Sequence, residues 1–94
     1  MNKSIERLRA EIGATDFHIV KNLQKRKLLV LKIAEIKKKY NSKIKDGKRE
    51  NAIKEKIKKL ALEKNLDVAF VMRLYGLILK NSRMEQNKSK NLRK

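Results

Sequence analysis

The sequence contains no cysteine, no proline and no tryptophan, and only three glycines and four phenylalanine or tyrosine residues. Without cysteine there are no disulfide bonds and no thiol catalysis, and a structural zinc site is not expected. So few aromatic residues argue against a base-stacking platform for single-stranded nucleic acid. Proline interrupts a helix because it lacks a backbone N–H and clashes with the preceding turn, and this chain has none. Of these absences, that of proline favours an uninterrupted helix.

Long apolar runs are also missing. No run approaches the roughly 18 residues expected of a membrane-spanning helix, and the first six residues lack the hydrophobic region of a signal peptide. A cysteine-free chain suits a reducing compartment. We therefore expect a cytoplasmic protein that is not associated with a membrane.

The composition is that of a small helical protein. Its 94 residues, 40% hydrophobic and 39% charged, predict one domain spanning residues 1–94. The net charge of +17 by itself favours a polyanion such as RNA or DNA as the partner. However, basic runs such as residues 37–39 spread around a helix instead of forming one stripe. A basic helical nucleic-acid-binding protein is therefore an alternative, not the main prediction.

Residues 5–40 carry the strongest periodic signal and predict one long helix. At 100° per residue, eleven positions share a sector of roughly 100°. They are Ile5, Leu8, Ile12, Thr15, Ile19, Leu23, Arg26, Val30, Ile33, Lys37 and Tyr40. Such a helix is about 54 Å long, whereas a compact domain of this size is about 32 Å across. One chain cannot cover this stripe, so a partner chain is expected.

Two cations interrupt that apolar stripe. Arg26 and Lys37 occupy positions where core residues belong, and a charge there needs a partner, a route to water or an anionic ligand. They lie 11 residues apart, or about 16 Å along one helix face. This separation does not suit a direct partner for either side chain, but it suits a small anion bridging them. The stripe therefore predicts a site for a small acidic ligand.

Polar residues divide the rest of the chain into two further helices. After a loop at residues 40–45, Asp46 suits an N-cap with Gly47 at the first helical position. Asn65 suits a left-handed C-cap and Asp67 a second N-cap, so the third helix begins near Val68. The expected inward residues are Arg49, Ile53, Ile57, Leu60 and Ala61, and then Val68, Val71, Tyr75, Ile78, Ser82 and Gln86, with Met72 and Leu79 flanking. Residues 87–94 are expected to form a basic, frayed tail.

Over residues 5–86 the chain resembles the all-helical, AroQ-type (type II) chorismate mutases. The residues that carry the resemblance are Leu8, Arg9, Ile12, Asp16, Arg26, Lys37, Asp46, Gly47, Lys48, Arg49, Glu50, Ser82 and Gln86. The resemblance implies an all-α, three-helix protomer whose long first helices intertwine in a homodimer. It also implies an enzyme, an isomerase that converts chorismate to prephenate by a Claisen rearrangement in the biosynthesis of phenylalanine and tyrosine.

The resemblance also implies a role for each site residue. Arg26 and Arg49 resemble the arginines that hold the substrate carboxylates, and Arg9 resembles the one that the partner chain contributes. Lys37 and Gln86 resemble the pair that hydrogen-bonds the ether oxygen. Among the remaining lining residues, Glu50 resembles the partner of the ring hydroxyl, while Asp46 and Ser82 support position and polarity.

An intramolecular rearrangement needs neither a nucleophile nor a cofactor, and we expect no cofactor and no metal. His18, the one histidine, lies away from the apolar stripe of residues 5–40 and suggests no catalytic triad. Two alternatives share the scaffold: a lyase that acts on isochorismate to give salicylate and pyruvate, and an inactive homologue. The set of Asp46, Glu50 and Ser82 favours the mutase.

Overall fold

The computed structural model describes residues 3–40 and 47–92 of the chain. It contains α1 (Lys3–Lys39), α2 (Gly47–Glu63) and α3 (Val68–Leu92), and no strand occurs in these ranges. The expected all-α, three-helix protomer with a long first helix is therefore confirmed. The start of α2 at Gly47 agrees with the sequence pattern, whereas Asp46, its expected N-cap, lies outside the described residues.

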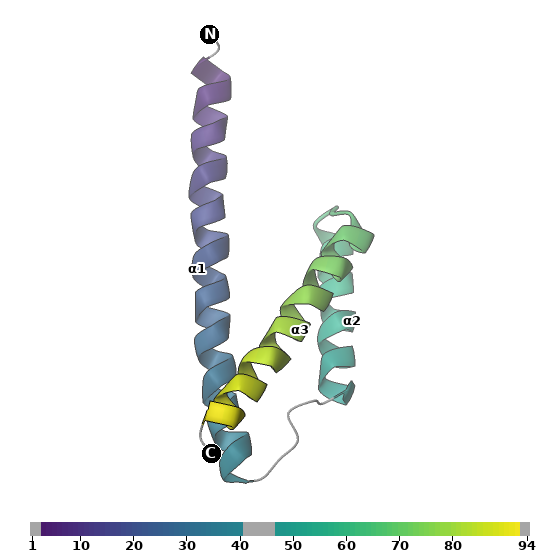
Figure 1. Cartoon of the computed structure of the whole chain (residues 1–94). Helices are drawn as coiled ribbons and strands as arrows, with labels where there is room; N and C mark the ends of the chain where they lie inside the picture. Colours follow the sequence, from purple (N-terminus) through teal and green to yellow (C-terminus); the bar gives the residue numbers. More distant parts are fainter. Residues whose placement is uncertain (1–2, 41–46, 93–94) are drawn as a thin grey trace.

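The helix α3 joins the other two helices. It packs against α1 and against α2, whereas no Cα atom of α1 lies within 8 Å of a Cα atom of α2. Figure 1 shows the C-terminal half of α3 crossing the C-terminal half of α1, and the N-terminal half of α3 diverging from α1 beside α2. The N-terminal half of α1 stands clear of both. The protomer is an open V whose two arms meet near the end of α1.

This open shape leaves much of the protein surface uncovered. The longest dimension is 58 Å and the radius of gyration is 17.2 Å, compared with about 12 Å for a compact chain of this length. The accessible surface of 8329 Å² exceeds by about 2,700 Å² the roughly 5,650 Å² expected of a compact monomer of this mass. The protomer therefore exposes considerably more surface than a compact monomer of its mass.

The apolar core is small. Ala34, Ala61 and Leu79 are the buried apolar residues of the described chain. In contrast, the apolar stripe of α1 is largely exposed, with Leu8 at 58% of its maximal area and Ile12 at 60%. Leu60, expected to face inward, is 48% exposed; that prediction was wrong because α3 covers only one side of α2. None of the described helices is long and apolar enough to span a membrane.

The connection between α2 and α3 follows the sequence prediction closely. Asn65 has a φ of 56°, in the left-handed region. The amide of Leu66 donates to the Ala61 carbonyl at 2.9 Å, and that of Asn65 to the Leu62 carbonyl at 3.2 Å, which is a Schellman C-cap. The Asp67 carboxylate then accepts from the Phe70 amide at 3.2 Å and caps α3. Two adjacent caps therefore reverse the chain within a few residues.

The end of α3 differs from the sequence expectation. The helix continues to Leu92 and so includes residues 87–92, for which the pattern predicts fraying. Extending a helix that has already formed requires fixing only one residue per added hydrogen bond, and no glycine or proline occurs in this segment. The loss of apolar period at Asn87 marks the end of packing, since Asn87 and Lys88 are exposed, but not the end of the helix.

The left-handed conformation of Asn65 gives a stability prediction. Asn65→Ala should lower the free energy of unfolding by about 1 kcal/mol, because alanine pays the full steric cost of this conformation. Asn65→Gly should be at least as stable as the parent chain. Urea unfolding followed by circular dichroism, at one fixed protein concentration, checks both. Equal losses in the two variants would show that the Asn65 side chain, and not its backbone, stabilises the turn.

Candidate active site

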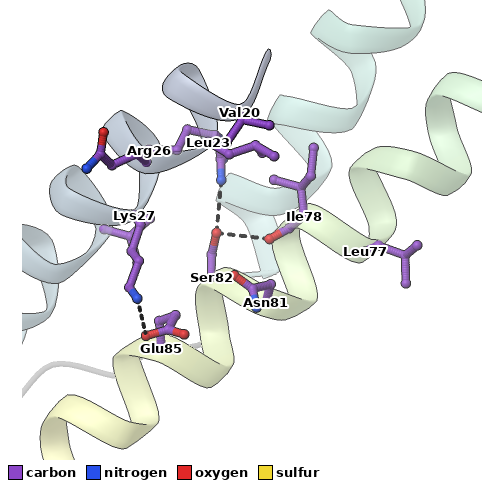
Figure 2. Close-up of a pocket in the computed structure, with 11 residues that line it drawn as sticks. Val20, Leu23, Arg26, Lys27, Leu77, Ile78, Asn81, Ser82 and Glu85 are labelled. Carbon is purple, nitrogen blue, oxygen red and sulfur yellow. Dashed lines mark hydrogen bonds and ion pairs between the residues drawn. The ribbon is translucent and has the colours of Figure 1, made fainter. Parts of the chain in front are cut away.

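Arg26 is fixed in the crevice between α1 and α3. Its Nη1 donates to the hydroxyl oxygen of Ser82 at 2.9 Å, and Ser82 in turn donates to the Ile78 carbonyl at 3.0 Å. Figure 2 shows the two bonds meeting at the Ser82 hydroxyl. Both side chains are partly buried. Ser82 therefore aims a cation that would otherwise be free to adopt several rotamers.

A cavity of about 570 Å³ opens beside this pair. Its walls are mainly apolar, and its polar groups come from facing positions on the two helices. The lining residues are Val20, Leu23, Gln24, Arg26, Lys27, Val30, Leu77, Ile78, Asn81, Ser82 and Glu85. Lys27 lies 3.9 Å from Glu85, but its side chain is 54% exposed, so solvent screens this pair. An apolar cavity with a fixed cation suits a small organic anion.

Gln86 lies one helical turn beyond Ser82 on α3 and is 7% exposed. Its Nε2 donates to the Val30 carbonyl at 3.5 Å, a distance at the weak limit of hydrogen bonding. A buried amide needs good partners, because desolvating it is costly. The weak bond leaves its donor capacity to be used by a ligand. The contact between α1 and α3 thus brings three of the predicted site residues, Arg26, Ser82 and Gln86, into one region of the protomer.

Glu50 belongs to a second polar cluster, between α2 and α3. It lies in the first turn of α2, and its Oε1 accepts a hydrogen bond from Arg83 Nη1 at 2.6 Å. A cavity of about 320 Å³ adjoins the pair. Its lining residues are Gly47, Glu50, Asn51, Lys54, Gly76, Leu79 and Arg83.

The sequence analysis missed Arg83. A signal was available, since Gly76, Leu79 and Arg83 follow an i, i+3, i+7 spacing that places them on one helix face. This face is adjacent to the one that carries Ser82 and Gln86. The predicted stripe of α3 follows the face that meets α1, whereas Arg83 lies on the face that meets α2.

Of the other predicted site residues, Arg9, Lys37 and Arg49 line neither of these two cavities. Lys37 is partly buried on α1, about 16 Å along the helix from Arg26. Arg49 is exposed at the start of α2, and Arg9 is exposed near the start of α1, about 25 Å from Arg26. Asp46 lies outside the described residues. Within residues 3–40 and 47–92, no group of three or more histidine or acidic side chains is placed to hold a metal ion.

The family model for type II chorismate mutases matches residues 8–87. The chain belongs to this family. The match covers the whole α1–α3 crevice and the Glu50 cluster, so the sequence resemblance is confirmed. The all-α architecture of this chorismate mutase family member agrees with that assignment.

Three curated relatives are each named bifunctional chorismate mutase/prephenate dehydratase. The protein of Buchnera aphidicola subsp. Schizaphis graminum is 43% identical over 83 residues, which cover 88% of this chain and 22% of the relative. That of Buchnera aphidicola subsp. Acyrthosiphon pisum is 38% identical over 93% of this chain and 23% of the relative. That of Enterobacter agglomerans is 33% identical over 84% and 20%. This mutase-family chain thus spans about a fifth of the length of these relatives.

The weak bond of Gln86 predicts that this residue does not stabilise the fold. Gln86→Met should leave the free energy of unfolding within about 1 kcal/mol of the parent or raise it, because an apolar side chain of similar volume needs no hydrogen bond. Leu79→Ala, at a buried apolar position on the same helix, is the control and should cost about 2–5 kcal/mol. Chemical unfolding measures both. A Gln86→Met loss as large as the Leu79→Ala loss would make Gln86 a structural residue.

Proposed function

We propose that this chain converts chorismate to prephenate by an intramolecular Claisen rearrangement, with the substrate in the α1–α3 crevice. The observation that carries the proposal is the side-by-side placement of Arg26, fixed by Ser82, and the buried, weakly bonded Gln86. Membership of the type II chorismate mutase family supports it. A reducing, cytoplasmic setting fits the cysteine-free sequence.

The chemistry requires positioning and electrostatic stabilisation. The flexible dianion must be held with its reacting carbons close together, and donors must meet the charge that develops on the breaking carbon–oxygen bond. In the proposed site Arg26 and Arg49 bind carboxylates, while Lys37 and Gln86 donate to the ether oxygen. A glutamine donates through its neutral amide over a wide pH range. Glu50 accepts from the ring hydroxyl, and Asp46 and Ser82 complete the lining.

We further propose that the working enzyme is a homodimer. The exposed apolar stripe of α1 and the surface excess of about 2,700 Å² per chain fit the large, apolar interfaces of obligate homodimers. If two α1 helices pair antiparallel about a two-fold axis near residue 20, position 9 of one chain lies level with position 31 of the other. Arg9 of the partner subunit then lies between Arg26 and Lys37 and completes the site.

A direct assay tests the activity. The purified chain should consume chorismate, followed by the loss of its absorbance, and chromatography should identify prephenate as the product. Salicylate and pyruvate from isochorismate, without prephenate from chorismate, would indicate the lyase instead. A chain that converts neither substrate, yet is folded by circular dichroism, would refute the proposed function.

Lys37→Ala should lower kcat by about 10²–10³-fold, the scale for losing one preorganised donor to a developing charge. The substitution should leave the helical content unchanged. Lys32→Ala is the matched control, because Lys32 is an exposed lysine on the same helix, and it should retain nearly full activity. Steady-state kinetics and thermal unfolding are measured together. Near-normal activity of the Lys37→Ala chain would remove Lys37 from the site.

Mixing two inactive variants tests the shared site. Arg9→Ala and Lys37→Ala chains, unfolded together and refolded, should form mixed dimers in which one site has both residues intact. With random pairing, half of the dimers are mixed, so about a quarter of all sites should recover. If Arg9 acts within its own chain, every site lacks one residue. The mixture would then be no more active than its separately refolded components.

A further inference from the structure

We infer that Arg83 is a positioning residue for the proposed reaction: it holds the Glu50 carboxylate so that its second oxygen, Oε2, meets the substrate hydroxyl. The inference rests on the proposed function and adds a residue to which the family resemblance gives no role. It depends on the α2–α3 ion pair and on the cavity beside that pair.

The contact between Arg83 and Glu50 is short and partly buried. The Nη1–Oε1 distance is 2.6 Å, and the Arg83 and Glu50 side chains are 30% and 15% exposed. Hydrogen bonds between two ionised groups are shorter and stronger than those between neutral groups. A bond at Oε1 restricts rotation of the carboxylate and so fixes the direction of Oε2. Glu50 therefore has a defined orientation before a ligand arrives.

The two helices give the pair its place. Glu50 lies in the first turn of α2, so no preceding turn of that helix packs against its side chain. Arg83 comes from the middle of α3, one turn beyond the buried Leu79. A long side chain anchored on a well-packed helix thus reaches across to a carboxylate at the start of its neighbour. The cavity between Gly76 and Glu50 keeps the space beside the carboxylate open.

Stability alone does not account for this pair. An exposed ion pair contributes little to folding, and a buried one must offset the desolvation of both charges, so a partly buried pair such as this one gains only modestly in stability. Lys54, one turn beyond Glu50 on α2, also lines the cavity and stands at the i+4 position that favours helix ion pairs. The bond that Glu50 accepts nevertheless comes from Arg83, whose planar guanidinium loses less freedom in forming such a bond. This choice of partner favours a role in positioning.

A double-mutant cycle tests whether Arg83 acts through Glu50. The four chains are the parent, Arg83→Gln, Glu50→Gln and the double variant. Each is assayed for kcat/KM with chorismate, at a temperature well below the lowest thermal midpoint of the four. Arg83→Gln should lower kcat/KM on the order of tenfold, the scale for losing a residue that orients a functional ligand. In the Glu50→Gln background, the same change should cost less than about twofold, because the residue to be oriented is already altered.

Two further variants distinguish a positioning role of Arg83 from a long-range effect of its charge and from a role in packing. Arg73→Gln removes an arginine from an exposed position of the same helix and should leave kcat/KM unchanged, which controls for long-range attraction of an anionic substrate. Arg83→Lys keeps the charge and can supply a single donor. It should recover most of the activity lost in Arg83→Gln, while a role in packing alone would shift the thermal midpoint without changing kcat/KM.

The outcomes are distinct. An equal loss from Arg83→Gln in both backgrounds would mean that Arg83 contacts the substrate directly, and unchanged kcat/KM in the parent background would mean that it has no part in the reaction. Either result overturns the inference while the mutase function stands. If Arg83→Gln does not fold, an Arg83→Lys chain that folds but is impaired equally in the presence and absence of Glu50→Gln also overturns it. If the parent chain has no activity on chorismate, the proposed function itself is wrong.

Discussion

The length of α1 is the constraint on which the rest of the protomer depends. A helix of 37 residues is too long for the two helices that follow it to cover, and α3 meets only its C-terminal half (Figure 1). The N-terminal half carries an apolar stripe that neither α2 nor α3 covers. The chain consequently has an extended shape, few buried side chains and a crevice open on one side. Each of these features leaves room for a second copy in the proposed dimer.

The helix α3 organises the polar groups within this open frame. Ser82 and Gln86 face α1, where they meet Arg26 and the Val30 carbonyl. Arg83, one residue after Ser82, faces α2 and meets Glu50. Adjacent positions on a helix are about 100° apart, so one turn of α3 supplies contacts to both other helices. Moving α3 would therefore disturb both clusters at once, which links the orientation of Arg26 to that of Glu50.

Sequence periodicity predicted the local features of the three helices. The unbroken first helix, the cations in its stripe and the capped turn at Asn65 and Asp67 are all local features, set by residue spacing and backbone preference. The exposure of Leu60 and the pairing of Arg83 with Glu50 were not predicted. Both depend on which face of α2 is covered by α3, and periodicity defines the face of a helix without identifying its neighbour. The continuation of α3 to Leu92 was missed because polar residues end packing sooner than they end a helix.

The polar side chains that the proposed reaction needs lower the stability of the fold at the proposed site. Arg26, Gln86 and Glu50 replace apolar groups where helices meet, and the described chain buries only three apolar residues to offset them. A domain this small has little stability to spare. The proposed dimer resolves this conflict, because the apolar surface of α1 is covered by the same association that brings Arg9 of the partner subunit to the site. Association in the proposed dimer would stabilise the fold by an amount that rises with the logarithm of the protein concentration, so a folded chain would also be one whose active sites are complete.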